Sequence, residues 1–119
     1  SDRGMLESPL IVLCGEFSRT PRMDDGGNGG PAGSKGATGR DHWGNSMFCL
    51  LGGGGVKGGR IVGATNRLGD APADRPVRPG HIHHTIYRVL GMDPEMHFPD
   101  HSGRPTIAVD HGEVISELF

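Results

Sequence analysis

Two short apolar runs, separated by a long glycine-rich connection, constrain the fold of this chain more than any other feature. The runs are PLIVLC at residues 9–14 and SMFCLL at residues 46–51, and glycine follows each of them. Continuous apolar runs of this length indicate strands buried on both faces, which occur mostly in α/β sheets with helices above and below. The connection, residues 15–44, exceeds the roughly 12–15 residues beyond which a loop is usually functional or disordered. We therefore expect an α/β fold with a functional loop between its first two strands.

The rest of the chain predicts one clear helix and several weaker elements. Ile82, Ile86, Val89 and Leu90 recur on one helical face, and Gly91 follows as a natural helix terminator, so a helix is predicted over 81–90. The weaker predictions are the end of a helix at 1–8, a surface loop at 64–80, a short strand at 106–109 and a helix at 110–119 begun by a cap at Asp110.

The composition leaves little material for a core. Glycine accounts for 22 of the 119 residues, and the chain has six aromatic residues, whereas glycine averages about 7% in typical domains. Either the chain is loop-rich around a small sheet, or it is an incomplete domain whose core is completed by other segments. We prefer the second reading because the chain begins SDRG without an initiator methionine. It is treated as a single segment, 1–119, with a flexible glycine-rich loop at 24–39.

Charge and hydropathy exclude two classes of partner, and the cysteines suggest buried thiols. The net charge is −2, with both signs interspersed, so nothing resembles the basic stripe of a nucleic-acid-binding protein. No apolar run approaches the roughly 20 residues needed to span a bilayer. Cys14 and Cys49 lie inside the two apolar runs without CxxC spacing. Two buried free thiols are the preferred interpretation, and a disulfide between them remains the open alternative.

Candidate site residues flank the glycine-rich loop. Glu16 follows the first predicted strand, and Asp41 and His42 stand just before the second. Ligands in α/β sheets bind beyond the carboxyl ends of strands, so a loop that returns to the sheet would bring His42 close to Glu16. Imidazole and carboxylate are ligand types that suit Zn²⁺ and similar ions, and Arg40 and the Trp43 indole N–H could orient them.

Each of these residues also has a purely structural interpretation. Asp41 could cap a turn while His42 packs beside Trp43, and Glu16 could pair with Arg19 or Arg22. Three further motifs are read structurally. GGGGVKGG at 52–59 opens no helix and is taken as a flexible turn rather than a phosphate loop. The histidines of HIHH at 81–84 are placed on a solvated helix face, and DHG at 110–112 is read as a helix cap.

The order of the motifs is more specific than any one of them. GEFSRTP at 15–21, GRDHW at 39–43, LLGGGGVKGG at 50–59 and RPVRPGHIHHTIYRVLGMDP at 75–94 resemble the C-terminal part of the bacterial "domain of unknown function 1501" proteins. That family is identified here with the alkaline-phosphatase/sulfatase superfamily, and the resemblance covers about Gly4 to Phe119. It implies the C-terminal portion of an α/β sandwich, in which a large mixed sheet is flanked by helices and a metal site lies at the strand ends.

The resemblance implies a metal-dependent hydrolase of phosphate or sulfate esters. On this reading His42 and Glu16 are metal ligands, Asp41 is a ligand or orients His42, and Arg40 or Arg19 holds the anion. The implied cofactor is a divalent metal, zinc by ligand type, and the implied substrate is a small anionic ester. The nucleophile would come from elsewhere, so this chain alone is expected to be inactive, with the remainder of a parent chain or a partner completing the sheet.

The resemblance also carries an alternative function. Phe17 stands where the superfamily has a further metal ligand, and it offers no ligand atom. A non-catalytic binding or scaffold protein with a degenerate metal site is therefore the second hypothesis, and purely structural completion of a larger chain is the third. Such families are typically exported, which favours the periplasm or secretion and leaves the cytoplasm open.

Overall fold

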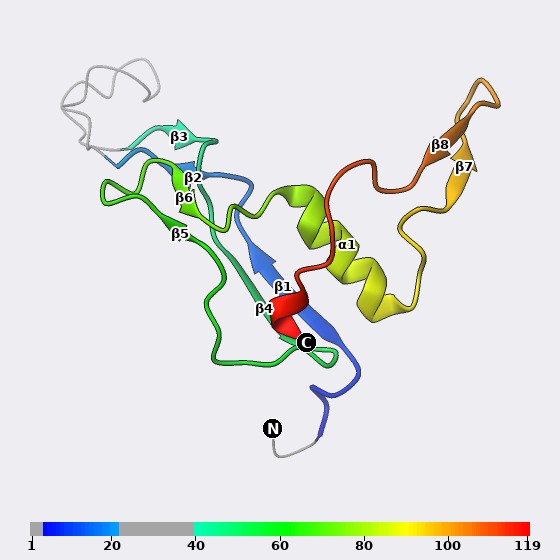
Figure 1. Ribbon diagram of the computed structural model, residues 1–119, viewed down its shortest axis with the longest axis horizontal. Coiled ribbons are helices and arrows are strands. Elements are labelled where there is room, and N and C mark those ends of the chain that lie inside the picture. Colours follow the sequence, from blue (N-terminus) through cyan, green and yellow to red (C-terminus); the bar gives the residue numbers. More distant parts are fainter. Residues whose placement is uncertain (1–3, 22–39) are drawn as a thin grey trace, which may run out of the picture. The chain divides into compact units, whose positions relative to one another are not determined.

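The computed structural model describes residues 4–21 and 40–119, so the predicted loop at 24–39 and Arg22 lie outside the described residues (Figure 1). The elements, in chain order, are β1 (Leu10–Cys14), β2 (Ser18–Arg19), β3 (His42–Trp43), β4 (Cys49–Gly53), β5 (Ala64–Thr65), β6 (Pro72–Asp74), α1 (Pro79–Leu90), β7 (His97–Pro99), β8 (Pro105–Ile107) and the 3₁₀-helix η1 (Ser116–Leu118). In the described parts these strands form two-stranded sheets, β1–β4, β2–β3, β5–β6 and β7–β8. The combination of small sheets and a helix is that of a small α/β fold.

The described chain divides into two compact units. One comprises residues up to Val12, Leu51–Val62 and Val77–Phe119, and the other comprises Leu13–Leu50 and Gly63–Pro76. The first unit contains α1, and the second contains β2, β3 and the β5–β6 hairpin. No helix in the described ranges is long and apolar enough to cross a membrane.

The two predicted strands are present and lie side by side as β1 and β4, although β4 begins three residues later than predicted and extends into Gly52 and Gly53. Gly53 and Gly54, at the end of β4, lie against Pro9 and Leu10, at the start of β1. The two strands therefore run in opposite directions. Gly54 also contacts the Val89 side chain of α1, so a side chain at this position would collide with the helix.

The prediction that these strands are buried on both faces is wrong. Along β1, Leu10 and Val12 are half-buried, whereas Ile11 is 52% exposed and Leu13 is 61% exposed. On β4, Leu50 is 57% exposed. Alternate residues of a strand point to opposite faces, and this sheet has two strands in the described structure. One face is therefore better covered than the other.

Helix α1 begins two residues earlier than predicted and ends where expected. Pro79 fits the first helical position because its missing N–H has no partner to lose there. The Nδ1 atom of His81 accepts a hydrogen bond from the Arg78 backbone N–H at 3.1 Å, while the His81 N–H donates to the Arg78 carbonyl at 3.0 Å. Gly91 ends the helix with a φ of 69°, in the left-handed region that favours glycine.

The C-terminal segment packs against α1 but is not the predicted helix. Its helical part is limited to the 3₁₀ turn Ser116–Leu118, and Ile115 and Leu118 are buried with Val109. Asp110 does not cap a helix; its carboxylate lies 3.3 Å from His111 Nε2 at an exposed position. Gly112 has a φ of 124° and contacts Gly80. Residues 110–115 are therefore irregular rather than α-helical, because the φ of Gly112 lies outside the α region where this segment meets α1.

Two other expectations need correction, and one strand is shifted. Residues 4–9 form turns and bends rather than the end of a helix, and the predicted loop at 64–80 contains the β5–β6 hairpin and the first turn of α1. The strand expected at 106–109 is β8, Pro105–Ile107, which pairs antiparallel with β7.

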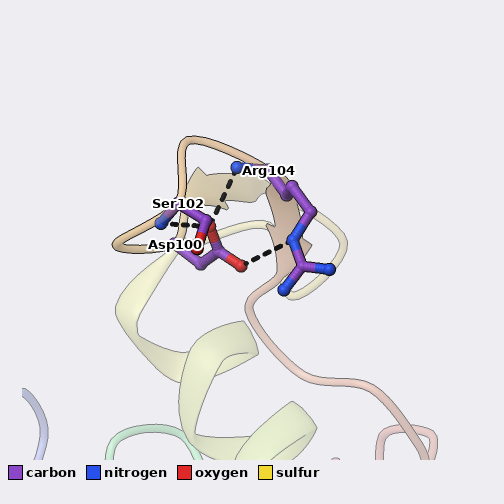
Figure 2. A network of polar contacts seen from close by, with 3 residues as sticks. All are labelled: Asp100, Ser102 and Arg104. Atoms are coloured by element: carbon purple, nitrogen blue, oxygen red, sulfur yellow. Dashed lines mark hydrogen bonds and ion pairs between the residues drawn. The ribbon is translucent and has the colours of Figure 1, made fainter.

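The turn between β7 and β8 is organised by one carboxylate (Figure 2). Asp100 accepts hydrogen bonds from the backbone N–H groups of Ser102 and Arg104, at 2.8 and 2.9 Å, and from Arg104 Nε at 3.2 Å. The Arg104 backbone N–H foremost, followed by the Ser102 N–H and the Arg104 side chain, lowers the pKa of Asp100.

Candidate functional site

The two ends of the long connection meet in the β2–β3 ladder. The strands pair antiparallel, with Ser18 opposite Trp43 and Arg19 opposite His42. The pairing continues beyond the strands, because the Thr20 N–H donates to the Asp41 carbonyl at 3.0 Å and the Asp41 N–H donates to Thr20 Oγ1 at 3.2 Å. The chain thus returns to a segment that closely follows Glu16, as the sequence suggested.

Trp43 anchors this ladder to the loop between β5 and β6. Its indole Nε1–H donates to the Asp70 carbonyl at 2.6 Å, and Ser46 Oγ donates to the Gly69 carbonyl at 3.3 Å. The Asn66 side chain orders the same loop by accepting from the N–H groups of Leu68 and Asp70. The indole N–H therefore bonds to a backbone carbonyl, whereas the sequence had suggested that it could orient a metal ligand.

Phe17 packs against the His42 ring. The two ring centroids are 4.1 Å apart, with an interplanar angle of 36°. His42 is exposed and Phe17 is half-buried, so the phenyl ring supports one side of the imidazole and leaves the other accessible. The structural interpretation expected His42 to pack beside Trp43, but the aromatic ring that packs on His42 is that of Phe17.

The two arginines flank His42. Arg19 is the residue opposite His42 in the ladder, and its Nη1 donates to the Arg40 carbonyl at 3.3 Å. Both arginines are exposed. Directly opposite residues of an antiparallel pair share a face, with Cβ atoms about 4.5–5.5 Å apart. The side chains of Arg19 and His42 therefore leave the backbone on the same face of this ladder.

Glu16 and Asp41 are the remaining predicted metal ligands, and with His42 they do not make a metal centre in the described chain. Both residues are exposed, Glu16 in the bend after β1 and Asp41 just before β3. Across residues 4–21 and 40–119, no group of three or more His, Cys, Asp or Glu side chains is placed to hold a metal ion. His42, Glu16 and Asp41 do not by themselves form a three-ligand site in the described chain.

The glycine motif at 52–59 forms a turn, as predicted. The Val56 N–H donates to the Gly53 carbonyl at 3.0 Å, and the Lys57 N–H donates to the Leu118 carbonyl at 2.8 Å. Lys57 therefore belongs to the contact between this turn and the C-terminal segment. The sequence held no signal for that contact, because it joins positions far apart in the chain.

These elements define a small α/β protein with an exposed, polar surface on the β2–β3 ladder. This surface, the β2–β3 edge, consists of Arg19, Arg40, Asp41 and His42. The chain matches, over residues 1–119, the family model described as "Protein of unknown function (DUF1501)", and it belongs to that family. The family resemblance seen in the motifs is thereby confirmed. No curated protein and no solved structure matches the chain.

Proposed function

We propose that the protein is a metal-dependent hydrolase of phosphate or sulfate esters, of the alkaline-phosphatase/sulfatase superfamily, and that its β2–β3 edge binds the ester anion. The observation that carries the proposal is the register of the ladder, in which Arg19 stands opposite His42. A guanidinium matches the oxygens of phosphate or sulfate with two parallel N–H donors. Arg19, with Arg40 beside it, would supply those donors next to an imidazole.

The metal part of the proposal needs ligands beyond the described residues. His42, Glu16 and Asp41 have the donor atoms that suit zinc, but no three-ligand group is present in the described part of the chain. Further ligands and the nucleophile would come from the remainder of a parent chain or from a partner, and this chain alone would be inactive. Export to the periplasm or beyond the cell is part of the same proposal.

Exposed apolar side chains support the idea of a larger sheet. Val109, Ile115 and Leu118 are the buried apolar residues of the described structure, while Ile11 and Leu13, which share one face of β1, are 52% and 61% exposed. Clusters of exposed large apolar groups usually mark surfaces covered by other protein. The α/β sandwich proposed for the complete protein would cover such groups with further strands and helices.

Metal analysis of the complete protein, purified without chelator, tests the hydrolase. Stoichiometric zinc and turnover of an aryl phosphate or aryl sulfate are expected, and both should be lost in His42→Ala. The matched control is His83→Ala, since His83 is an exposed residue of α1 outside the β2–β3 ladder. Full zinc and activity in His42→Ala would refute the assignment of His42.

A non-catalytic binding protein is the second candidate. The observation that favours it is the packing of Phe17, which has no ligand atom, against His42. This candidate predicts no stoichiometric metal and no turnover in the complete protein. It also predicts calorimetric binding of inorganic phosphate or sulfate that is weakened in Arg19→Ala. Metal-dependent turnover would exclude it.

A further inference from the structure

The two cysteines occupy the same end of the β1–β4 sheet. Cys14 is the last residue of β1, and Cys49 is the first residue of β4. The strands are hydrogen-bonded neighbours, and the contacts of Gly53 and Gly54 with Pro9 and Leu10 show that they run in opposite directions. The last residue of one strand is therefore beside the first residue of the other.

The side chains of the two cysteines are neighbours, and one of them is open to solvent. The Cys14 thiol lies near enough to the Cys49 thiol to raise its pKa, in keeping with their places at the same end of the paired strands. Both are free thiols; Cys14 is exposed and Cys49 is half-buried. The expectation of two buried thiols is thus wrong, because this end of the sheet is not covered as the apolar runs had suggested. The exposure of Cys14 makes the pair accessible to reagents in solution.

The two thiols differ in their readiness to react. Burial first, and then the neighbouring Cys14 thiol, raises the pKa of Cys49. The thiolate is the nucleophile in exchange with a disulfide, so Cys49 is disfavoured as the first residue to attack. Cys14 is exposed to solvent, so it is the thiol that attacks the disulfide first.

The geometry of neighbouring strands makes a bond between them possible but strained. Directly opposite residues have Cβ atoms about 4.5–5.5 Å apart, whereas a relaxed disulfide joins Cβ atoms about 3.5–4.5 Å apart. A bond across the strands requires them to approach locally. Strained, exposed disulfides have more oxidising potentials than structural ones and are reduced more easily.

We propose that Cys14 and Cys49 form a reversible thiol–disulfide switch that locks together the ends of β1 and β4. The oxidant is a low-molecular-weight or protein disulfide, RSSR. The Cys14 thiolate attacks one sulfur of RSSR, forming Cys14–S–SR and expelling RS⁻. The Cys49 sulfur then attacks the Cys14 sulfur of this mixed disulfide and expels the second RS⁻. The protons of the two cysteines pass to the two leaving thiolates, so that two thiols and RSSR give one disulfide and two RSH.

The switch acts on the chain segments that lead to the β2–β3 ladder. Gly15 and Glu16 follow Cys14 directly, and residues 44–48 join β3 to Cys49. A bond between the two cysteines fixes the spacing at which these segments leave the sheet. The inference does not depend on the proposed function, because it concerns the thiols alone.

Equilibration of the whole chain in glutathione buffers of increasing oxidised fraction tests the proposal. Samples are quenched with acid, alkylated and weighed by mass spectrometry. We expect a reversible loss of two alkylatable thiols per chain, with its midpoint inside the buffer series. The oxidised chain takes up no alkyl group and weighs about 2 Da less than the unalkylated reduced chain, because it has lost two hydrogens. Cys49→Ser should yield a glutathione adduct at Cys14 instead, and Cys14→Ser should form an adduct at Cys49 more slowly.

Three results would overturn the switch. The first is that both thiols remain alkylatable in the most oxidising buffer, and the second is that the only disulfide formed links two chains. The third is an internal disulfide that resists the most reducing buffer, which would make the bond structural rather than reversible. The wild-type titration decides these outcomes even if a serine variant fails to fold.

Discussion

The Thr85 hydroxyl connects helix α1 to the C-terminal segment through Ile115. Thr85 Oγ1 donates to the His81 carbonyl at 2.7 Å and accepts from the Ile115 N–H at 3.1 Å. Thr85 is 0% exposed and Ile115 is 2% exposed. The hydroxyl therefore satisfies a backbone N–H that is closed off from water, beside the buried residues Val109 and Leu118.

Replacing Thr85 with valine should destabilise the protein despite conserving its shape. The Ile115 N–H would stay buried without an acceptor, and such a loss costs about 1–3 kcal/mol. Chemical denaturation should show a lower midpoint with an unchanged slope. Thr85→Ser is the control, since it keeps the oxygen and loses only a methyl group. A midpoint for Thr85→Val at or above that of Thr85→Ser would contradict the role of this hydrogen bond.

Gly80→Ala should destabilise the protein although alanine favours helices. Relative to glycine, alanine stabilises a helix interior by about 1 kcal/mol, but a Cβ at Gly80 would overlap the His111 carbonyl oxygen. Overpacking of this kind costs about 1–3 kcal/mol, so the net change in unfolding free energy should be negative. Gly58→Ala is the matched control, because nothing lies within 4 Å of a Cβ there. Thermal melting distinguishes the two variants.

Trp43→Phe should loosen the β2–β3 ladder. The substitution keeps a large ring but removes the donor to the Asp70 carbonyl, a hydrogen bond worth about 0.5–1.5 kcal/mol. Hydrogen exchange should accelerate at the amides of Thr20 and Asp41, which pair the two segments. The amides of α1 serve as internal reference. Unchanged exchange at Thr20 and Asp41 would show that the indole is not an anchor.

The β7–β8 turn should lose stability in acid. The pKa of Asp100 is lowered in the folded state, foremost by the Arg104 backbone N–H, so its carboxylate stabilises the turn at pH values above the unfolded pKa of about 3.9. That contribution is lost as the pH falls through the lowered folded pKa. A carboxyl titration by NMR should give Asp100 a midpoint below the unfolded value of about 3.9. Asp100→Asn should remove the acid dependence of amide exchange at Ser102 and Arg104.

The residues of the β2–β3 edge could be chosen from the sequence, but their arrangement could not. Polar residues at the two ends of a long loop marked Arg19 and His42, because loops that return to a sheet bring their ends together. The register that sets them opposite each other depends on hydrogen bonds across the ladder. The packing of Phe17 on His42 and the anchoring of Trp43 on Asp70 likewise depend on side chains distant in sequence.

The sequence predicted those helices and strands that neighbouring residues alone are enough to specify. The apolar runs of β1 and β4, the spacing of Ile82, Ile86 and Val89 in α1, and the stop at Gly91 needed only neighbouring residues, and the motif order sufficed to identify the family. Only the tertiary structure decided that Ile11 and Leu13 are exposed, that residues 110–115 are not helical, and that Cys14 lies beside Cys49. The burial of a residue and the pairing of a strand depend on the segment that packs against them. That segment is distant in the sequence, so the local pattern of residues does not identify it.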